Sequence, residues 1–316
     1  MYNSPLVSVL IPCYNVSAYV EKAIRSILQQ TYANIEIWVI DDASTDDTLQ
    51  KIGAIKDKRI KIVAYKQNTQ KVGAVNEVLK HVNGELICFQ DADDWSEPGR
   101  IEQQVQQFKN DSGLGICFTK YCYTGFKDTL PCRIALSHEE LRNEFLEFGK
   151  HKNSNFDPTA CPTMMVTKKA LQNTGGYHLY FAGRVAEDIQ WIYRILKTYK
   201  GITIDELLYN YSAREGSFTH LQFEGKNAKY AYSWQLLAKI IHKDIYENID
   251  VLELENINVL KELELEACEE ALMEIIQRYN SAKDNFEKSY SYRLGNILLA
   301  PIRFLKKINM VGTSII

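Results

Sequence analysis

The chain has 316 residues, of which 46% are hydrophobic and 24% are charged, and these fractions are ordinary for a globular protein with a sizeable core. Its formal net charge of -3 gives no overall attraction to nucleic acid or to an anionic membrane, so either partner would need a local patch. The seven cysteines are an odd number without a C-x-x-C pair, which argues against a disulfide framework or a zinc knuckle and predicts reduced thiols in a cytosol.

The start of the chain and its hydropathy bear on location. Residues 1–5 are polar and lack the basic start, apolar core and small-residue cleavage site of a signal peptide. No apolar run in the sequence approaches the roughly 18 to 20 residues of a membrane-spanning helix. We therefore expect the catalytic part to face the cytoplasm, and a position at the inner face of the cytoplasmic membrane stays open.

The first third of the chain alternates strand and helix patterns. Buried-strand patterns occur at residues 7–11, 35–40, 61–65 and 86–89, and helical spacing occurs at residues 18–30, 72–82 and from 96 to about 108. A further helix should follow the second strand, with Ser44 or Thr45 as its cap and Asp47 in its first turn. Pro98 is expected near the first position of the last of these helices. The alternation predicts an α/β fold with a doubly wound, mostly parallel sheet.

The remainder of the chain is less regular. A strand is predicted at residues 115–123 and a helix at residues 186–198, and we expect the region from 115 to 219 to cover the open edge of the sheet. After about residue 223 the composition shifts to long helices. We therefore predict a catalytic domain at residues 1–222 and a C-terminal helical extension at residues 223–316.

The helical extension carries two patterns whose interpretation stays open. Apolar residues recur every three and four positions at Leu265, Cys268, Leu272, Ile275, Tyr279, Ala282 and Phe286. This spacing fits a short coiled coil, and hence a homo-oligomer through residues 254–286, or a helix packed on its own domain. From residue 288 onward five basic residues and no acidic ones alternate with apolar ones. Residues 288–310 are therefore a candidate for peripheral membrane contact, with a solvated or oligomeric tail as the alternative.

Acidic residues follow two of the predicted strands, at the points where these strands end. Asp41 and Asp42 follow the second strand, and Asp91, Asp93 and Asp94 follow the fourth. The carboxyl ends of parallel strands open into the crevice where such sheets bind ligands. Two carboxylates one residue apart can converge on one hard cation, which prefers oxygen ligands and leaves positions for phosphate oxygens. The sequence therefore predicts one site for a divalent metal and a phosphorylated ligand.

Several segments, in order across roughly residues 6 to 220, resemble the inverting glycosyltransferases of the GT-A fold, in particular glycosyltransferase family 2. They are VSVLIPCYN at 7–15, SILQQTY at 26–32 with IEIWVIDDASTD at 35–46, KVGAVN at 71–76, GELICFQDADD at 84–94, and GGY at 175–177 with Glu187, Asp188 and Arg194. The resemblance implies a GT-A sheet and the transfer of a sugar from a nucleotide-diphosphate donor to an acceptor hydroxyl. It also implies Mg²⁺ or Mn²⁺ as cofactor.

The resemblance assigns the donor side position by position. Pro12, Tyr14 and Asn15 would line the base pocket, with Tyr14 against the nucleobase. Asp42 would accept a hydrogen bond from the base, and capping the next helix is its alternative role. Lys71 would approach the base or a phosphate, since the family often has Arg where this chain has Val next to Asn76; a surface lysine is the alternative.

The same resemblance assigns the metal and the diphosphate. Asp91 would hold the ribose or sugar side of the donor and share the metal, Asp93 would ligate Mg²⁺ or Mn²⁺, and Asp94 would support the site from behind. Many members carry a histidine in a later segment where this chain places Arg214. Arginine cannot ligate a metal, but it can bind a diphosphate through two parallel hydrogen bonds.

Asp188 is the expected general base. In an inverting displacement one carboxylate takes the proton of the acceptor hydroxyl while that oxygen attacks the anomeric carbon from the side opposite the departing nucleotide. Glu187 is its neighbour, but adjacent side chains on a helix point roughly 100° apart, so we expect only one of them to face the reaction. The alternative is that both acids only favour the helix N-terminus.

Other functions explain the sequence less well. A haloacid-dehalogenase-like phosphatase has its Asp-x-Asp after the first strand, whereas this chain has it after the fourth. A sugar nucleotidyltransferase needs a glycine-rich segment after the first strand, and a dinucleotide-dependent dehydrogenase needs Gly-x-Gly-x-x-Gly after an early strand; this chain has neither. A catalytically inactive nucleotide-sugar-binding scaffold is the remaining alternative. The favoured function is transfer from a uridine diphosphate sugar to a glycan or lipid-linked acceptor in surface polysaccharide synthesis, without a nucleic acid partner.

Overall fold

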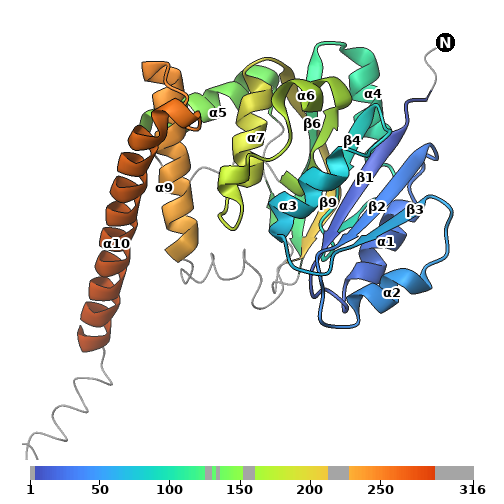
Figure 1. The fold of residues 1–316 in the computed structure, drawn as a ribbon, viewed down its shortest axis with the longest axis horizontal. Coiled ribbons are helices and arrows are strands. Elements are labelled where there is room, and N and C mark those ends of the chain that lie inside the picture. Colours follow the sequence, from blue (N-terminus) through green and yellow to red (C-terminus); the bar gives the residue numbers. More distant parts are fainter. Residues whose placement is uncertain (1–3, 125–129, 133–135, 152–160, 213–227, 289–316) are drawn as a thin grey trace, which may run out of the picture. The chain divides into compact units, whose positions relative to one another are not determined.

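The structure is a computed structural model that describes residues 4–124, 130–132, 136–151, 161–212 and 228–288. The chain divides into two compact units, residues 1–264 and residues 265–316. The first unit contains the described sheet and the helices that cover it (Figure 1). The domain boundary expected near residue 222 lies outside the described residues, so the division into a catalytic domain and a helical extension stays a prediction.

Four parallel strands form one half of the sheet. Val, Ile and Leu make up most of the two central ones, β2 and β1, as expected for parallel strands whose two faces are both covered. In sheet order the four are β3 (Ile60–Ala64), β2 (Ile35–Asp41), β1 (Val7–Cys13) and β4 (Leu86–Phe89). The strands predicted in the first third of the chain are confirmed, with bounds that differ by two residues at most.

The other half of the sheet is mixed and comes largely from later in the chain. Its strands are β8 (Met165–Thr167), β6 (Leu114–Thr124), β9 (Lys200–Ser212), β5 (Trp95–Ser96) and β7 (Leu130–Cys132), which pairs with β6. β8 runs antiparallel to both β4 and β6, and β9 runs parallel to β6. The expectation that this region covers the sheet edge is wrong. It extends the sheet instead, because the buried Met165 and Val166 of β8 pair with β4.

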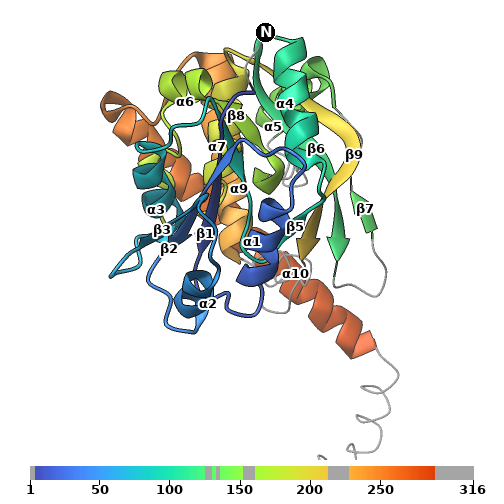
Figure 2. The ribbon, with the colours of Figure 1, turned by 90° about the vertical axis from the view of Figure 1, so that its right-hand side faces the viewer.

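Helices cover both faces of the sheet (Figure 2). α1 (Val20–Leu28) and α4 (Arg100–Asn110) pack against one face, where Val9 and Ile37 belong to the same core. On the other face the ring of Phe89 contacts Tyr177 and Trp191. The other helices are α2 (Thr48–Ala54), α3 (Gln70–Leu79), α5 (His138–His151), α6 (Lys168–Thr174), α7 (Glu187–Leu196), α9 (Ala228–His242) and α10 (Ile257–Lys288), with short turns η1 (Cys161–Thr163), η2 (Leu179–Phe181), η3 (Lys243–Glu247) and η4 (Leu254–Asn256).

The start of α2 differs from the expectation. The helix begins at Thr48, and neither Ser44 nor Thr45 caps it. The Ser44 hydroxyl accepts a hydrogen bond from the N–H of Asn15 (3.0 Å), and the N–H of Thr45 donates to the Asn15 side chain (2.8 Å). These residues therefore tie the loop after β1 to the loop after β2, while Asp46 accepts from the N–H of Thr48.

The start of α4 also differs. It begins at Arg100, two residues after Pro98, because Trp95 and Ser96 pair with β9 and form a short strand of their own. The predicted helix is present, but its first turn is delayed by this long-range pairing.

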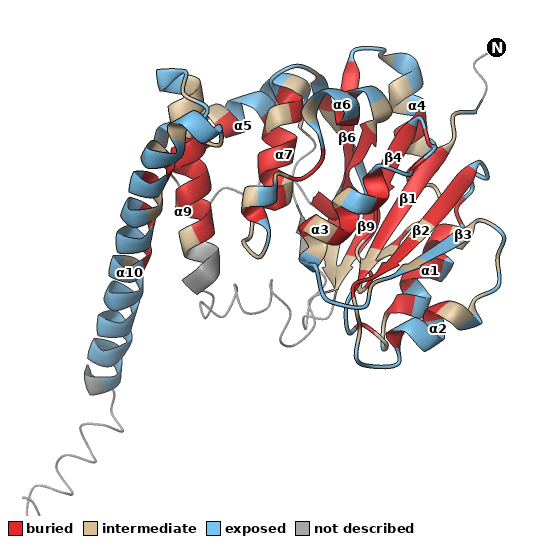
Figure 3. Ribbon diagram, in the orientation of Figure 1, coloured by how far each residue is buried: buried red, intermediate tan, exposed pale blue. Residues whose placement is uncertain are grey.

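The C-terminal part of the described chain is one helix of 32 residues, α10. Most of its residues are exposed (Figure 3). None of the helices in the described ranges combines the length and the apolarity that a bilayer crossing requires. Apart from Lys288, the basic tail expected at residues 288–310 lies outside the described residues.

Candidate active site

The carboxyl ends of β1 and β4 open into one pocket of about 230 Å³. Its lining consists of Pro12, Cys13, Tyr14, Val16, Asp42, Lys71, Ala74, Asp91, Ala92 and Asp93. Adjacent parallel strands deliver these side chains because their carboxyl ends lie at the same edge of the sheet. Six of the side chains expected on the donor side or at the metal therefore meet in one place. Arg214, expected at the diphosphate, lies outside the described residues.

The part of the pocket expected to hold the base is formed by Tyr14 and Asp42. Tyr14 is 48% exposed, which leaves a ring face available to a planar ligand. Asp42 Oδ1 accepts hydrogen bonds from the N–H and the hydroxyl of Thr69, at 2.8 and 2.9 Å. Asn15, also expected here, is absent from the pocket lining; its side chain accepts from Thr45, and its φ of 51° marks a tight turn.

Tyr209 of β9 anchors the turn that carries the acidic cluster. Its hydroxyl donates to Asp94 Oδ2 (2.8 Å) and accepts from the N–H of Asp91 (3.1 Å). The other oxygen of Asp94 accepts from the N–H of Ser212 (2.7 Å). Burial, together with Asp91 and Asp93, raises the pKa of Asp94 well above its usual range. Asp94 therefore joins the turn to β9.

Arg100 fixes the end of β4 from beneath. Its guanidinium is fully buried and donates to the backbone carbonyls of Phe89 (2.8 Å) and Pro162 (3.0 Å) and to the side chain of Gln90 (3.2 Å). The same group lies 4.9 Å above the ring of Tyr209. Sequence reasoning did not single out Arg100 or Tyr209, because neither lies in a recognisable motif and both act across long sequence separations.

Lys71 connects the donor pocket with two further carboxylates. Its Nζ lies 3.5 Å from Glu187 Oε1, 3.9 Å from Asp91 Oδ1 and 4.0 Å from Asp188 Oδ2. Partial burial lowers the pKa of Lys71, but the carboxylates around it, Asp91 first, raise the pKa well above its usual range. The ammonium therefore stays charged and reduces the mutual repulsion of the acids.

Both acids at the start of α7 face this cluster. The expectation that only one of them points inward is wrong, since the helix begins there and both carboxylates lie within 4.0 Å of Lys71 Nζ. Burial, and then Asp188, raise the pKa of Glu187 to about 7. Asp188 Oδ1 accepts a hydrogen bond from the N–H of Ile189 (2.8 Å). The residue before them, Ala186, has a φ of 75°, so the chain enters the helix through a sharp turn.

A model of glycosyl transferase family 2 matches residues 8–174, which include the whole pocket lining. The chain belongs to glycosyl transferase family 2. The resemblance inferred from the motifs, and the α/β sheet that it implies, are thereby confirmed.

Relatives and solved structures agree with this assignment. Glycosyltransferase GlyG of Streptococcus pneumoniae is 30% identical over 280 residues, which cover 82% of this chain and 88% of that protein. WfaP of Escherichia coli, a UDP-Glc:alpha-D-GlcNAc-diphosphoundecaprenol beta-1,3-glucosyltransferase, is 41% identical over 170 residues, covering 53% of this chain and 63% of that protein. Mannosyltransferase PcManGT from Pyrobaculum calidifontis, solved with GDP-Man and Mn²⁺, shares the fold with a TM-score of 0.56 at 19% identity, covering 95% of this chain and 85% of that chain.

Asp91 and Asp93 are the residues of this family 2 glycosyltransferase that could hold a divalent metal. Among the described residues, no group of three or more His, Cys, Asp or Glu side chains is arranged to hold a metal ion. A magnesium-type cation, however, uses only one or two protein carboxylates when substrate phosphates and water supply its other ligands. Asp91 and Asp93 line one pocket and provide that number. The donor set therefore fits a cation that arrives with a diphosphate.

The turn that follows α6 is held by a side chain of α3. Asn76 donates through Nδ2 to the carbonyl of Tyr177 (2.7 Å) and accepts at Oδ1 from its N–H (2.9 Å). Arg194 donates to the carbonyls of Thr174 and Gly176. Gly176 has a φ of +52°, and a Cβ there would lie 2.6 Å from Asn76 Oδ1. Asn76 and Arg194 therefore hold the turn at Gly176 in place.

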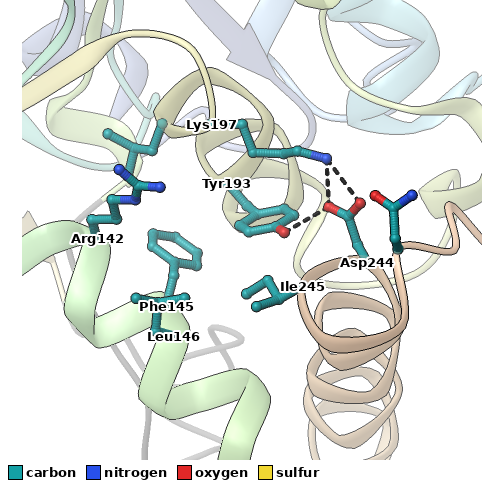
Figure 4. Close-up of a pocket in the computed structure, with 9 residues that line it drawn as sticks. Arg142, Phe145, Leu146, Tyr193, Lys197, Asp244 and Ile245 are labelled. Carbon is teal, nitrogen blue, oxygen red and sulfur yellow. Dashed lines mark hydrogen bonds and ion pairs between the residues drawn. The ribbon is translucent and has the colours of Figure 1, made fainter.

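A separate pocket of about 280 Å³ lies between α5, the end of α7 and η3 (Figure 4). Lys197 Nζ lies 2.7 Å from Asp244 Oδ2, and the Tyr193 hydroxyl donates to the same oxygen (2.6 Å). These polar groups of the pocket satisfy one another. The pocket also lies at the opposite end of α7 from Glu187, so it is separate from the pocket at the ends of β1 and β4.

Proposed function

We propose that the protein is a metal-dependent, inverting glycosyltransferase that takes a sugar from a nucleoside diphosphate, with uridine favoured, to a hydroxyl of a glycan or lipid-linked acceptor. The product would be part of a surface polysaccharide. One observation carries the proposal: Lys71 lies within 4.0 Å of Asp91, at the donor pocket, and also of Glu187 and Asp188. A nucleotide sugar in the pocket would thus have its reacting carbon near a candidate base.

Asp188 is proposed as the general base. It would take the proton of the acceptor hydroxyl as that oxygen bonds to the anomeric carbon, while the bond from this carbon to the diphosphate oxygen breaks with its electron pair. Its Oδ1 is held by the N–H of Ile189, which leaves Oδ2 to receive the proton. Lys71 would stay charged throughout and keep the neighbouring acids from repelling one another.

The donor site is proposed from the pocket lining. Tyr14 would stack on the base and Asp42 would accept from it, while Asp91 would hold the ribose or sugar. Asp93 and Asp91 would ligate Mg²⁺ or Mn²⁺. When bound, such an ion would offset negative charge on the departing diphosphate. Arg214 would assist at the diphosphate.

The choice of donor and acceptor rests on one relative. WfaP is named for a UDP-Glc donor and a lipid-linked diphosphoundecaprenol acceptor. PcManGT was solved with GDP-Man, so guanosine is the alternative nucleoside to be tested beside uridine. A lipid-linked acceptor would place the reaction at the inner face of the cytoplasmic membrane, where the basic tail at residues 288–310 would act as a surface contact.

The assignment of Asp188 is tested by Asp188→Asn. We expect sugar transfer to fall roughly 10²- to 10⁴-fold while donor binding is unchanged, since only the proton acceptor is lost. Asp111→Asn is the matched control, because Asp111 is an exposed acid paired with Lys200 outside the site. Full transfer by Asp188→Asn would refute the base assignment, and retention of anomeric configuration in the product would refute inversion.

The donor and metal assignments are tested by binding. Thermal melting with Mn²⁺ and with uridine, guanosine or thymidine diphosphate should show the largest rise for the uridine nucleotide, because a ligand that binds only the native state stabilises it. Asp93→Ala should abolish the part of the rise that depends on Mn²⁺. If donor hydrolysis and transfer are absent with and without Mn²⁺ although the nucleotide binds, the inactive scaffold is the better description.

A further inference from the structure

The C-terminal helix α10 displays a row of large apolar side chains to solvent. Leu265, Leu272 and Tyr279 are 62%, 55% and 68% exposed, and Ile275 is 40% exposed. Exposed apolar surface that is continuous along an element marks an interaction site in soluble proteins. The row is uninterrupted, because Ile257–Lys288 is a single helix.

The spacing of the row indicates what covers it. Leu265, Leu272, Tyr279 and Phe286 are seven residues apart, and Cys268, Ile275 and Ala282 fill the intervening positions. Alternate steps of three and four residues keep one seam against a single neighbouring helix, with the first set at heptad position a and the second at d. From residue 265 to residue 286 this seam is about 30 Å long. A second helix of similar length therefore fits it better than a flat surface does.

We propose that the partner is a second copy of this chain and that the two α10 helices pair antiparallel. The flanking positions e and g decide the orientation. In a parallel pair Arg278 would lie beside the partner's Lys283. This contact joins like charges, and the two-fold axis repeats it, so it disfavours this orientation.

The antiparallel orientation removes these conflicts. With the axis between residues 273 and 274, position e brings Glu262 beside the partner's Lys283, an attractive pair that occurs twice. At position g Ala271 carries no charge and is buried in its own chain. Neither flank then joins two like charges, and the acidic first half of each α10 lies along the partner's second half, in which Arg278, Lys283 and Lys288 balance Glu274, Asp284 and Glu287.

The seam itself also fits the antiparallel register. Position a then faces position d, so Leu265 lies opposite the partner's Ala282, and Cys268 opposite the partner's Tyr279. Large residues meet small ones, and Leu272 meets the partner's Ile275 at the centre, which gives layers of similar volume. A parallel pair would instead stack Tyr279 on the partner's Tyr279 and leave Cys268 against the partner's Cys268.

The oligomeric state of the full chain tests the proposal. Sedimentation velocity should give the mass of a dimer for the natural protein and half that mass for Leu272→Glu with Ile275→Glu. The matched control, Gln277→Glu with Ser281→Glu, adds the same charge to exposed positions off the seam and should stay a dimer. Unchanged helical circular dichroism would show that the monomeric variant is folded. A natural protein that is monomeric at all concentrations, or a seam variant that stays a dimer, would overturn the proposal.

Cross-linking tests the orientation. Antiparallel pairing separates the two Cys268 residues by about 16 Å along the axis, too far for a disulfide, whose Cα atoms lie within about 7 Å. Under mild oxidation Tyr279→Cys should form a covalent dimer, because Cys268 faces that position, whereas the natural protein should not. Adding Cys268→Ser should abolish the link. A dimer linked through Cys268 in the natural protein would show parallel pairing and overturn the orientation. Both experiments are independent of the sugar donor and of Asp188.

Discussion

The parallel half of the sheet, β3-β2-β1-β4, and the mixed half, β8-β6-β9-β5, position their parts of the site by different means. In the parallel half each acidic group follows directly from the strand that carries it, as Asp91 follows β4. Between the two halves single side chains reach across long separations, as Tyr209 of β9 does to Asp94 and as Asn76 does from α3 to Tyr177. The acids after β4 thus follow from the local sequence, whereas the turns at Asp94 and Tyr177 depend on a few long-range contacts.

The carboxylates around Lys71 are held close together against their mutual repulsion, so the stability of the protein should depend on pH through Glu187. The folded pKa of Glu187 is about 7, above the usual value of 4.5, so its contribution to stability is complete below about pH 4.5 and is lost as the pH rises through about 7. Glu187→Gln cannot ionise and escapes this loss. We expect it to exceed the natural protein in unfolding free energy by up to about 3 kcal/mol near pH 8, and by little near pH 4.5.

Urea unfolding at the two pH values measures this difference. Glu85→Gln, which changes an exposed acid in the loop before β4, is the control and should follow the natural protein at both. If Glu187→Gln and the natural protein lose stability in parallel as the pH rises, the ionisation of Glu187 is not the cause of the loss.

Two tyrosine hydroxyls, one in each half, allow a direct comparison. Tyr209→Phe removes one donor and one acceptor from the turn that carries Asp91 and Asp94, so we expect a loss of about 2 kcal/mol in stability and a clear fall in sugar transfer. Tyr32→Phe removes a single hydrogen bond to the carbonyl of Pro5 and should cost about 1 kcal/mol with transfer unchanged. Chemical unfolding and initial rates measure both. Equal effects on transfer would erase the distinction between the halves.

The smallest expected effect concerns the core of the parallel half. Ile37 is fully buried in β2, and Ile37→Val removes one methylene without a polar consequence. Stability should fall by about 1 kcal/mol, while kcat and KM stay unchanged, because the strand end that carries Asp42 keeps its backbone pairing. A changed KM for the donor would mean that this half transmits packing defects to the pocket.

The sequence predicts the parallel half well for a physical reason. Its strands at 35–40 and 86–89 are apolar runs with acids at their ends, so adjacent residues in the sequence predict the strand, its burial and the position of the site. The prediction from sequence fails where a contact with a residue far along the chain determines the local structure. The position of Ser44 predicts a helix cap, but its hydroxyl accepts a hydrogen bond from the N–H of Asn15 instead. Trp95 is expected just before a helix, but it pairs with β9.

The candidate site shows the same division. Asp91, Asp93 and Lys71 could be chosen from their motifs, although their roles stay predictions. The inward orientation of both Glu187 and Asp188 could not, because it depends on where α7 begins. The helix begins directly after Ala186, whose backbone is left-handed, and no sequence pattern predicts this conformation.

The two hydrogen bonds between Asn76 and Tyr177, beside Gly176, restrict which substitutions these positions can accept during evolution. A methyl group on residue 176 would collide with Asn76 Oδ1, and the backbone there already disfavours any side chain. A shorter residue at 76 would relieve the collision but release Tyr177. The two positions, a hundred residues apart, are therefore expected to mutate together or to stay fixed together, and an alignment of homologues would show them as a covarying pair.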